Sequence, residues 1–157
     1  INKKRTFAIA PGLGFSYHNF KQNIVISNNN ATIKYNLIAN GAIVDKNKLS
    51  LVAVDFPLEF RWRNSTFESH KFWRIYSGIK VSYLFYDRSR YIGNDGNYTV
   101  VTNPDINKLQ YGFYTAAGYN TWNLYAYYGV SDLFKNNILN SSKNIKSLSI
   151  GLMFYIL

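Results

Sequence analysis

The sequence predicts an all-β fold: a transmembrane, antiparallel, up-and-down β-barrel with a closed lumen. Three observations predict it. Apolar and polar residues alternate over long segments, aromatic residues gather at the ends of these segments, and short connections alternate with long ones. A period of two sends successive side chains to opposite faces of a strand. In a membrane barrel the apolar face meets lipid, whereas a soluble sheet buries it.

Composition agrees with one outer-membrane barrel domain over residues 1–157. The chain has 14 Tyr, 11 Phe and 3 Trp, which favour strands. It has no Cys, which excludes disulfides and cysteine metal sites. It also lacks the run of about 18 apolar residues that a transmembrane helix needs. The formal net charge of +10 is scattered along the chain, which fits anionic lipid head groups better than nucleic acid.

The clearest alternation runs from Val52 to Trp62. Its even positions are all apolar, and its odd positions include Asp55, Glu59 and Arg61. The other alternating segments are Thr6–His18, Lys71–Asp87, Leu109–Tyr119, Trp122–Val130 and Lys146–Leu157. Most exceed the usual globular strand of about 5 to 6 residues and reach the roughly 9 to 11 residues of a tilted membrane-spanning strand.

These six segments are fewer than the eight strands of the usual smallest membrane barrel. A sheet left open in lipid would expose unpaired backbone groups, each at a cost of several kcal/mol. We therefore expect eight strands, with the first hairpin missing from this chain and supplied by upstream residues or by a partner.

Aromatic residues on the apolar faces gather toward the segment ends. Amphipathic rings at both ends of an apolar band form the girdles that mark lipid–water interfaces. The predicted girdle consists of Phe7, Tyr17, Trp62, Trp73, Phe85, Tyr119 and Trp122.

The connections indicate how the barrel is oriented. Asn64–His70 and Asn120–Thr121 are short, whereas Ser89–Lys108 and Phe134–Ile145 are long and polar. Outer-membrane barrels have short periplasmic turns and long extracellular loops. We interpret residues 21–47 as an extracellular hairpin that projects beyond the membrane, with a flexible loop as the alternative.

The polar faces would then line the interior. Their charged residues are Asp55, Glu59, Arg61, Arg63, Arg74 and Lys80. An eight-stranded barrel is narrow enough for side chains to fill, and buried charges need partners. Folding the chain back at the short turn puts Glu59 opposite Arg74. It puts Asp55 near Gly78 and diagonal to Lys80, in a register that could slip by two residues. We expect a structural plug, with a proton or ligand path as the alternative.

No catalytic site is predicted. His18 and His70 fall on opposite sides of the membrane, so they cannot share a metal ion or a catalytic dyad. His18 has only Ser16 and Ser82 as candidate hydroxyl neighbours, and a lone His at a strand end is usually structural. We therefore expect no enzyme activity, no metal and no cofactor.

The last segment resembles the C-terminal β-signal that the barrel-assembly machinery reads. That signal has a polar residue, a Gly two positions later and two spaced hydrophobic residues near the terminus. Ser149, Gly151, Phe154 and Ile156 match these positions.

A second resemblance, to the PorT family of Bacteroidetes outer-membrane barrels, runs from Arg5 onward. It rests on Asp55–Arg63, His70–Tyr76, Val81–Leu84 and Ala116–Trp122. The resemblance implies a component or accessory of the type IX protein secretion system, coupled in some relatives to gliding motility. The expected partners are outer-membrane lipid, lipopolysaccharide and other type IX secretion proteins.

Three other functions stay open at this point. The chain could be a small channel or ligand-binding barrel, or a membrane-embedded lipid enzyme that uses His18. It could also be a soluble lipocalin-like barrel, which would turn the apolar face of Val52–Trp62 inward.

Overall fold

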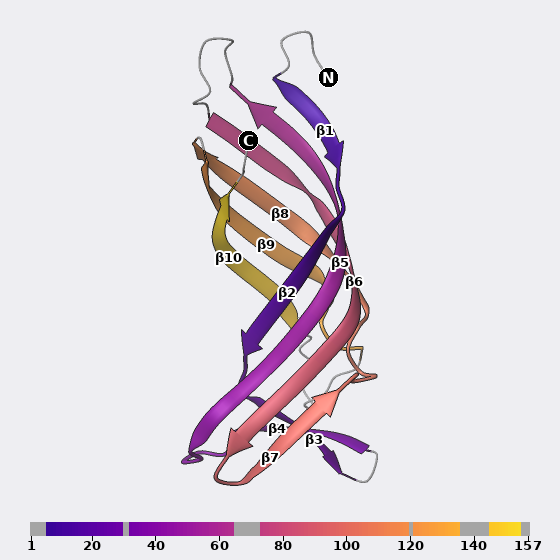
Figure 1. Cartoon of the computed structure of the whole chain (residues 1–157), viewed down its shortest axis with the longest axis vertical. Helices are drawn as coiled ribbons and strands as arrows, with labels where there is room; N and C mark the ends of the chain where they lie inside the picture. The colour runs from indigo at the N-terminus through magenta and orange to yellow at the C-terminus, as the bar shows by residue number, and fades with distance from the viewer. Residues whose placement is uncertain (1–5, 30–31, 65–72, 120, 136–144, 155–157) are drawn as a thin grey trace.

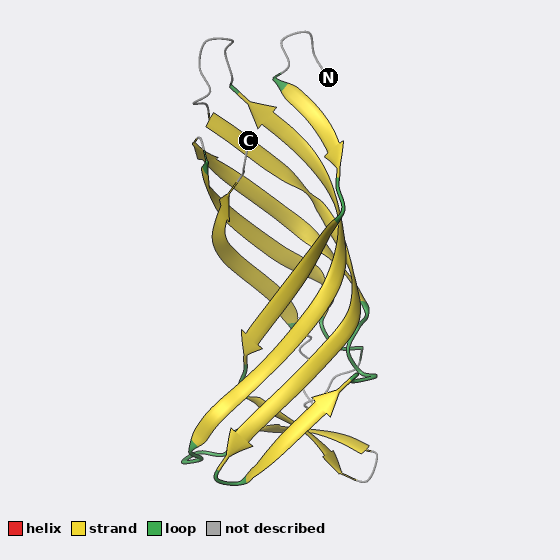
Figure 2. Ribbon diagram, in the orientation of Figure 1, coloured by secondary structure: helices red, strands yellow, loops and turns green. Residues whose placement is uncertain are grey.

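The chain forms one strongly curved antiparallel sheet with a small separate hairpin at one end (Figure 1). The computed structural model describes residues 6–29, 32–64, 73–119, 121–135 and 145–154. This part of the chain consists of strands and loops, and it holds no helix of the length and apolarity that crossing a membrane requires (Figure 2). The strands are β1 (Phe7–Pro11), β2 (Gly14–Lys21), β3 (Ile24–Asn29), β4 (Thr32–Leu37), β5 (Val44–Arg63), β6 (Trp73–Gly93), β7 (Gly96–Val101), β8 (Leu109–Tyr119), β9 (Trp122–Asp132) and β10 (Lys146–Phe154).

Neighbouring strands of the main sheet follow the order of the chain. β1 and β2 both pair with β5, and the order then continues through β6, β8, β9 and β10. β7 pairs with the far end of β6, while β3 and β4 form the separate hairpin. All these pairs are antiparallel, so the predicted antiparallel all-β fold is confirmed.

β1 and β2 form a single edge strand that is interrupted after Pro11. Both keep the same register against β5, starting from Phe7 opposite Trp62. Pro57 faces the interruption and has no N–H to donate to the ladder. Its carbonyl accepts a hydrogen bond from the Gly12 N–H at 2.9 Å. The pairing therefore passes the interruption without a shift.

The sheet curls so far that its two edge strands face a common interior (Figure 1). His18 of β2 lines the same internal cavity as Ser147 and Ser149 of β10. Among the described residues, however, no backbone pairing joins β1 or β2 to β10. The described strands thus form an open, barrel-like sheet rather than the closed lumen that the sequence predicts. The expected additional hairpin falls outside the described residues.

β5 and β6 are the longest strands, with 20 and 21 residues. Both strands are longer than the alternating segments from which they were predicted, Val52–Trp62 and Lys71–Asp87. β6 continues to Gly93 and turns back into β7, so the prediction of a long loop over Ser89–Lys108 is wrong for its first half. The alternation continues here, but the outward positions are taken by Arg88 and Arg90, while Ser89 and Tyr91 are buried. Because its outward residues are charged, this part of the strand was predicted to be a polar loop.

A β-bulge interrupts the β5–β6 ladder between Val52 and Ala53. On β6 it leaves both Phe85 and Tyr86 exposed, at 55 % and 40 %. One extra residue shifts the alternation of a strand by one position. Outward residues of β6 are therefore odd-numbered before the bulge and even-numbered after it.

The hairpin expected within residues 21–47 is present as β3 and β4, with Asn29 opposite Thr32. It does not stand free of the sheet, because β3 contacts β6 and β7 and buries Ile26 completely. The residues from Val44 onward belong to β5 rather than to this excursion. The hairpin thus covers one end of the curled sheet (Figure 1).

Beneath this hairpin lies a hydrophobic cluster, which we call the end core. It lies at the end of the sheet where β7 and the hairpin are found, the long-loop end. The opposite end, where β5 stops and β6 starts, is the short-turn end. The buried members of the end core are Ile26, Leu49, Leu51, Ala53, Leu84, Val100, Ile106, Leu133 and Phe134.

Candidate functional site

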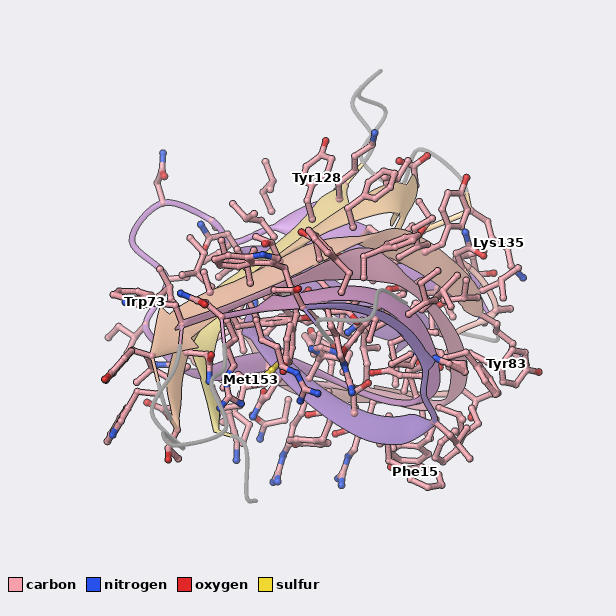
Figure 3. The ribbon with its side chains drawn as sticks, turned by 90° about the horizontal axis from the view of Figure 1, so that it is seen from above. Phe15, Trp73, Tyr83, Tyr128, Lys135 and Met153 are labelled. Atoms are coloured by element: carbon pink, nitrogen blue, oxygen red, sulfur yellow. The ribbon has the colours of Figure 1, made fainter. Side chains whose placement is uncertain are left out.

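The outward face of the curled sheet carries a band of exposed apolar side chains. Figure 3 shows Phe15, Trp73, Tyr83 and Tyr128 pointing away from the ribbon, and their exposed fractions run from 48 % to 78 %. Soluble monomers rarely expose apolar patches of more than a few hundred Å². A soluble lipocalin-like barrel would have placed this face inside, so that alternative is wrong.

At the short-turn end of the band, the structure gathers five residues of the predicted girdle. Phe7 lies opposite Trp62, and Tyr119 lies between Trp73 and Trp122. The rings of Trp73 and Tyr119 have centroids 5.5 Å apart. All are exposed except Trp62, which is half-buried. They fall in two neighbouring outward rows, because Trp62 lies opposite Ile75, two residues beyond Trp73.

At the other end of the band lie the remaining two girdle residues, Tyr17 and Phe85, which are 65 % and 55 % exposed. Val52 of β5 lies opposite both Tyr17 and Tyr86. The Tyr17 hydroxyl donates a hydrogen bond to Ser50 Oγ, 3.2 Å away and one row further toward the long-loop end. An apolar ring with a polar tip turned toward a polar row is the arrangement of an interfacial aromatic.

Asp55 and Lys80 form an ion pair in the middle of the interior. Lys80 Nζ lies 3.5 Å from Asp55 Oδ2, and both side chains are nearly inaccessible. Ser16 donates a hydrogen bond to Asp55 Oδ1 at 3.2 Å, and Lys80 Nζ lies 4.5 Å from the centre of the Tyr127 ring. These four residues come from β2, β5, β6 and β9, so the network ties four strands together across the interior.

The expected pairing of Glu59 with Arg74 is wrong. Glu59 lies opposite Gly78, four positions beyond Arg74, and Arg74 lies opposite Arg63. The register is displaced because β6 starts only at Trp73, so its connection to β5 is longer than the expected turn. Alternation fixes which face a residue takes but not the length of a turn.

Glu59 instead pairs with Arg61 on its own strand, where Arg61 Nε lies 2.7 Å from Glu59 Oε2. Arg61 also lies over the ring of Tyr76, 5.2 Å from its centre. The Arg61 side chain is 40 % exposed, so this pair is more open than the one between Asp55 and Lys80.

Several large side chains of the described strands are buried in the rest of this interior. Arg74 is 2 % exposed, and Tyr76, Tyr114 and Tyr127 are each 6 % exposed. The cavity between Lys80 and β10 has a volume of ≈ 20 Å³, which admits about one water molecule. We call this part, from Asp55 to the short-turn end, the polar interior. Its packing agrees with the expected structural plug.

A glycine provides the space for one of these rings. A Cβ added to Gly112 would lie 2.8 Å from the Tyr127 ring and 2.3 Å from the Tyr128 carbonyl oxygen. Real Cβ atoms do not approach other atoms so closely. The absence of a side chain at Gly112 therefore lets Tyr127 lie across β8 and reach Lys80.

The sequence reasoning missed the end core. On β5, Leu49 and Leu51 point inward and are 1 % and 2 % exposed, while Lys48 and Ser50 point outward. From Asp55 onward the polar residues point inward. The signal was present in the sequence as an alternation of opposite phase directly before Val52.

A polar cluster joins the β3–β4 hairpin to the end core. The Tyr35 hydroxyl donates a hydrogen bond to Asp105 Oδ2 at 2.7 Å and accepts one from Asn103 Nδ2 at 2.9 Å. The Asp105 N–H donates to Asn103 Oδ1 at 2.9 Å. Burial, together with the hydrogen bond to Asp105, raises the pKa of the Tyr35 hydroxyl. The hydroxyl therefore stays protonated and remains a donor.

Asp87 lies at the base of the same cluster. Its Oδ2 accepts a hydrogen bond from the Asn103 N–H at 2.8 Å, and both residues are buried. Burial raises the pKa of the Asp87 carboxyl, an effect that the hydrogen bond and Lys108 partly offset. The carboxyl thus holds the loop that carries Asn103 against β6.

The structure describes the surroundings of one of the two histidines, His18. Its ring stacks on Phe20 with centroids 5.8 Å apart, and it shares the small cavity with Ser82, while Ser16 bonds to Asp55. His70 lies outside the described residues. Within the described ranges, no group of three His, Cys, Asp or Glu residues could hold a metal ion.

Three residues of the expected assembly signal lie in β10. Ser149 lies opposite Tyr127 and lines the small cavity, and Gly151 lies opposite Tyr125 with no atom near the site of an added Cβ. Phe154 ends the strand, and Ile156 lies outside the described residues.

Comparison with known proteins agrees with this geometry. The model of a family described as outer membrane protein beta-barrel domain matches residues 1–135. No curated protein and no solved structure matches the chain. The match covers β1 to β9 and supports an outer-membrane location. The chain belongs to the outer membrane protein beta-barrel domain family.

Proposed function

We propose that the protein is a non-conducting outer-membrane barrel that serves as a structural, docking or assembly component of the type IX protein secretion system. The observation that supports the non-conducting part is the set of large side chains buried inside the described sheet. Lys80, Asp55 and Tyr127 occupy its middle, and the end core occupies the long-loop end. A barrel whose interior is filled offers solutes no path, and what it offers to partners is its surface.

The secretion role rests on the resemblance of Asp55–Arg63 and Ala116–Trp122 to the PorT family. In this proposal the short turns face the periplasm and the long-loop end faces outward, as in outer-membrane barrels generally. The partners are membrane lipid, lipopolysaccharide and other type IX secretion proteins. The protein acts without catalysis, because His18 packs as a structural residue.

Deletion of the gene in its native host tests this function. We expect secretion of type IX cargo to be lost while the permeability of the outer membrane to small solutes stays unchanged. Cargo secretion at the normal level in the deletion strain would overturn the secretion role. The variant His18→Ala should restore secretion as well as the natural protein does.

The non-conducting part has its own test. The purified full-length protein, reconstituted in planar bilayers, should show no single-channel conductance steps. Reproducible conductance that changes with substitutions at Lys80 would instead support the alternative, a small channel or ligand-binding barrel.

A further inference from the structure

A cationic hollow lies on the outward face, just beyond the apolar band at the long-loop end. We propose that it binds the phosphate groups of a phosphorylated glycolipid of the outer leaflet. The hollow has a volume of ≈ 190 Å³ and is lined by Tyr17, Asn19, Lys46, Lys48, Ser50, Arg88 and Arg90. The inference deepens the proposed function, because it rests on the outward orientation of the long-loop end.

Strand register places three cations side by side. Lys48 of β5 lies directly opposite Lys21 of β2 on one side and Arg90 of β6 on the other. We call these three residues the cationic row. Adjacent strands are about 4.8 Å apart, so the three side chains start within roughly 10 Å of one another. Arg88 lies one row closer to the apolar band, opposite Ser50.

This row is not neutralised from within the described chain. The hollow has no carboxylate in its lining, and no Asp or Glu of the described residues forms an ion pair with Lys48 or Arg90. Like charges placed directly opposite one another destabilise a sheet. Two such pairs in one row indicate that an external anion belongs there.

The position of the cationic row relative to the apolar band indicates that the anion belongs to a lipid. Two residues along a strand advance about 6.7 Å, which a tilt of roughly 40° reduces to about 5 Å along the membrane normal. Along β6, Arg88 therefore lies about 5 Å beyond Tyr86, which belongs to the same row as Tyr17, and Arg90 lies about 10 Å beyond Tyr86. The polar layer on each side of the hydrocarbon core is about 5 to 7 Å thick. Arg88 thus reaches head-group phosphates, and the row reaches charged groups just outside them.

The adjoining apolar band provides the second half of an amphiphile site. Directly below Tyr17, the outward residues Phe15 and Val54 lie opposite each other, and Tyr83 lies on the far side of Val54. Acyl chains can pack on this surface while phosphate meets the cations above. A free phosphate ion would gain only the upper half of these contacts.

The test uses the full-length protein in mild detergent and measures bound lipid by native mass spectrometry. The probes are diphosphorylated lipid A, the same lipid after enzymatic dephosphorylation, and inorganic phosphate. We expect the dephosphorylated lipid to bind at least about tenfold more weakly, because charge-assisted hydrogen bonds to phosphate are lost. Inorganic phosphate should not displace the lipid. This arm needs no variant, so a folding defect cannot obscure it.

The paired variants are Lys48→Gln with Arg90→Gln, and, as a control with the same loss of charge, Lys34→Gln with Lys135→Gln. The control cations are exposed and lie outside the hollow. We expect a loss of affinity of about tenfold or more in the first double variant and no change in the second. Equal binding of phosphorylated and dephosphorylated lipid, or equal loss in both double variants, would overturn the proposal. Neither result bears on cargo secretion, so the two proposals fail separately.

Discussion

The polar interior and the end core fill the same curled sheet in opposite ways. In the polar interior, Asp55 and Lys80 form a buried ion pair, and tyrosine rings pack around it. In the end core, Leu51, Leu84 and neighbouring apolar side chains pack as they would in a soluble protein. β5 runs through both regions, and its even-numbered residues point outward from Lys46 to Trp62.

The difference follows from what surrounds each region. Where the outward residues of β5 are apolar, from Val52 to Trp62, the inward ones carry charges. Where the outward residues are Lys46, Lys48 and Ser50, the inward ones include the buried Leu49 and Leu51. One strand therefore behaves as a membrane-barrel strand in one half and as a soluble-protein strand in the other. We infer that this reversal lies at the level where lipid gives way to water outside the sheet.

The largest difference in stability between the two regions is expected when a carboxylate is placed in each of them. Leu49→Asp removes a leucine from a part of the end core that does not line the cavity beside Lys80, and it buries a charge without a partner. We expect it to lower the free energy of unfolding by more than about 4 kcal/mol. Gln110→Glu puts a carboxylate into the cavity that Lys80 also lines, so a much smaller effect is expected. Urea unfolding of the two variants in detergent measures the difference. Equal losses would show that the two regions do not differ in polarity.

Removing one member of the ion pair tests the polar interior alone. Lys80→Ala leaves Asp55 with only the Ser16 hydroxyl, and we expect a loss of about 3 kcal/mol because an uncompensated buried charge remains. The double variant Asp55→Asn with Lys80→Met should regain most of this stability. The same urea unfolding measurement applies. A double variant as unstable as Lys80→Ala would mean that the ion pair itself stabilises the interior, rather than that its loss leaves a charge unpaired.

The packing around Tyr127 gives a third test. Gly112→Ala forces the new methyl group against the Tyr127 ring and the Tyr128 carbonyl, so we expect a loss of about 2 kcal/mol. Gly14→Ala is the matched control, because nothing lies within 4 Å of a Cβ added there. Thermal unfolding followed by circular dichroism compares the two. Equal melting temperatures would contradict the close approach of these strands.

The sequence predicted more of the fold than of the contacts between side chains inside the sheet. Alternation identified the faces of the strands, because a period of two is a local property. It did not reveal the pairing of Glu59, because the length of the turn before Trp73 set the register. It also missed the end core, because the exchange of polarity before Val52 has a cause outside the chain. The proximity of Tyr35 to Asp105 depends on how the hairpin packs, which no local pattern encodes.

At the long-loop end, the Tyr35 hydroxyl tests how the hairpin is held. Tyr35→Phe removes the hydrogen bonds to Asp105 and Asn103 while keeping the ring that packs against Phe134. We expect a loss of about 1 kcal/mol, confined to the hairpin and the end core. Hydrogen exchange resolved by mass spectrometry should show faster exchange in β3 and β4 and unchanged exchange in β8 and β9. Faster exchange throughout the sheet would mean that the two regions unfold as one unit.

The smallest effect is expected at Asp87, and it depends on pH. Because burial raises the pKa of this carboxyl in the folded protein, the folded state binds the proton more tightly than the unfolded state does. Stability at the long-loop end therefore falls as the pH rises from the ordinary range of an Asp through the raised folded value. Asp87→Asn removes that dependence, and its amide oxygen can still accept the hydrogen bond from the Asn103 N–H. Melting of the two proteins at several pH values between about 4 and 7 should give a difference in favour of Asp87→Asn that grows with pH. A difference that shrinks as pH rises would mean that the carboxylate, rather than the neutral acid, is the form that the end core stabilises.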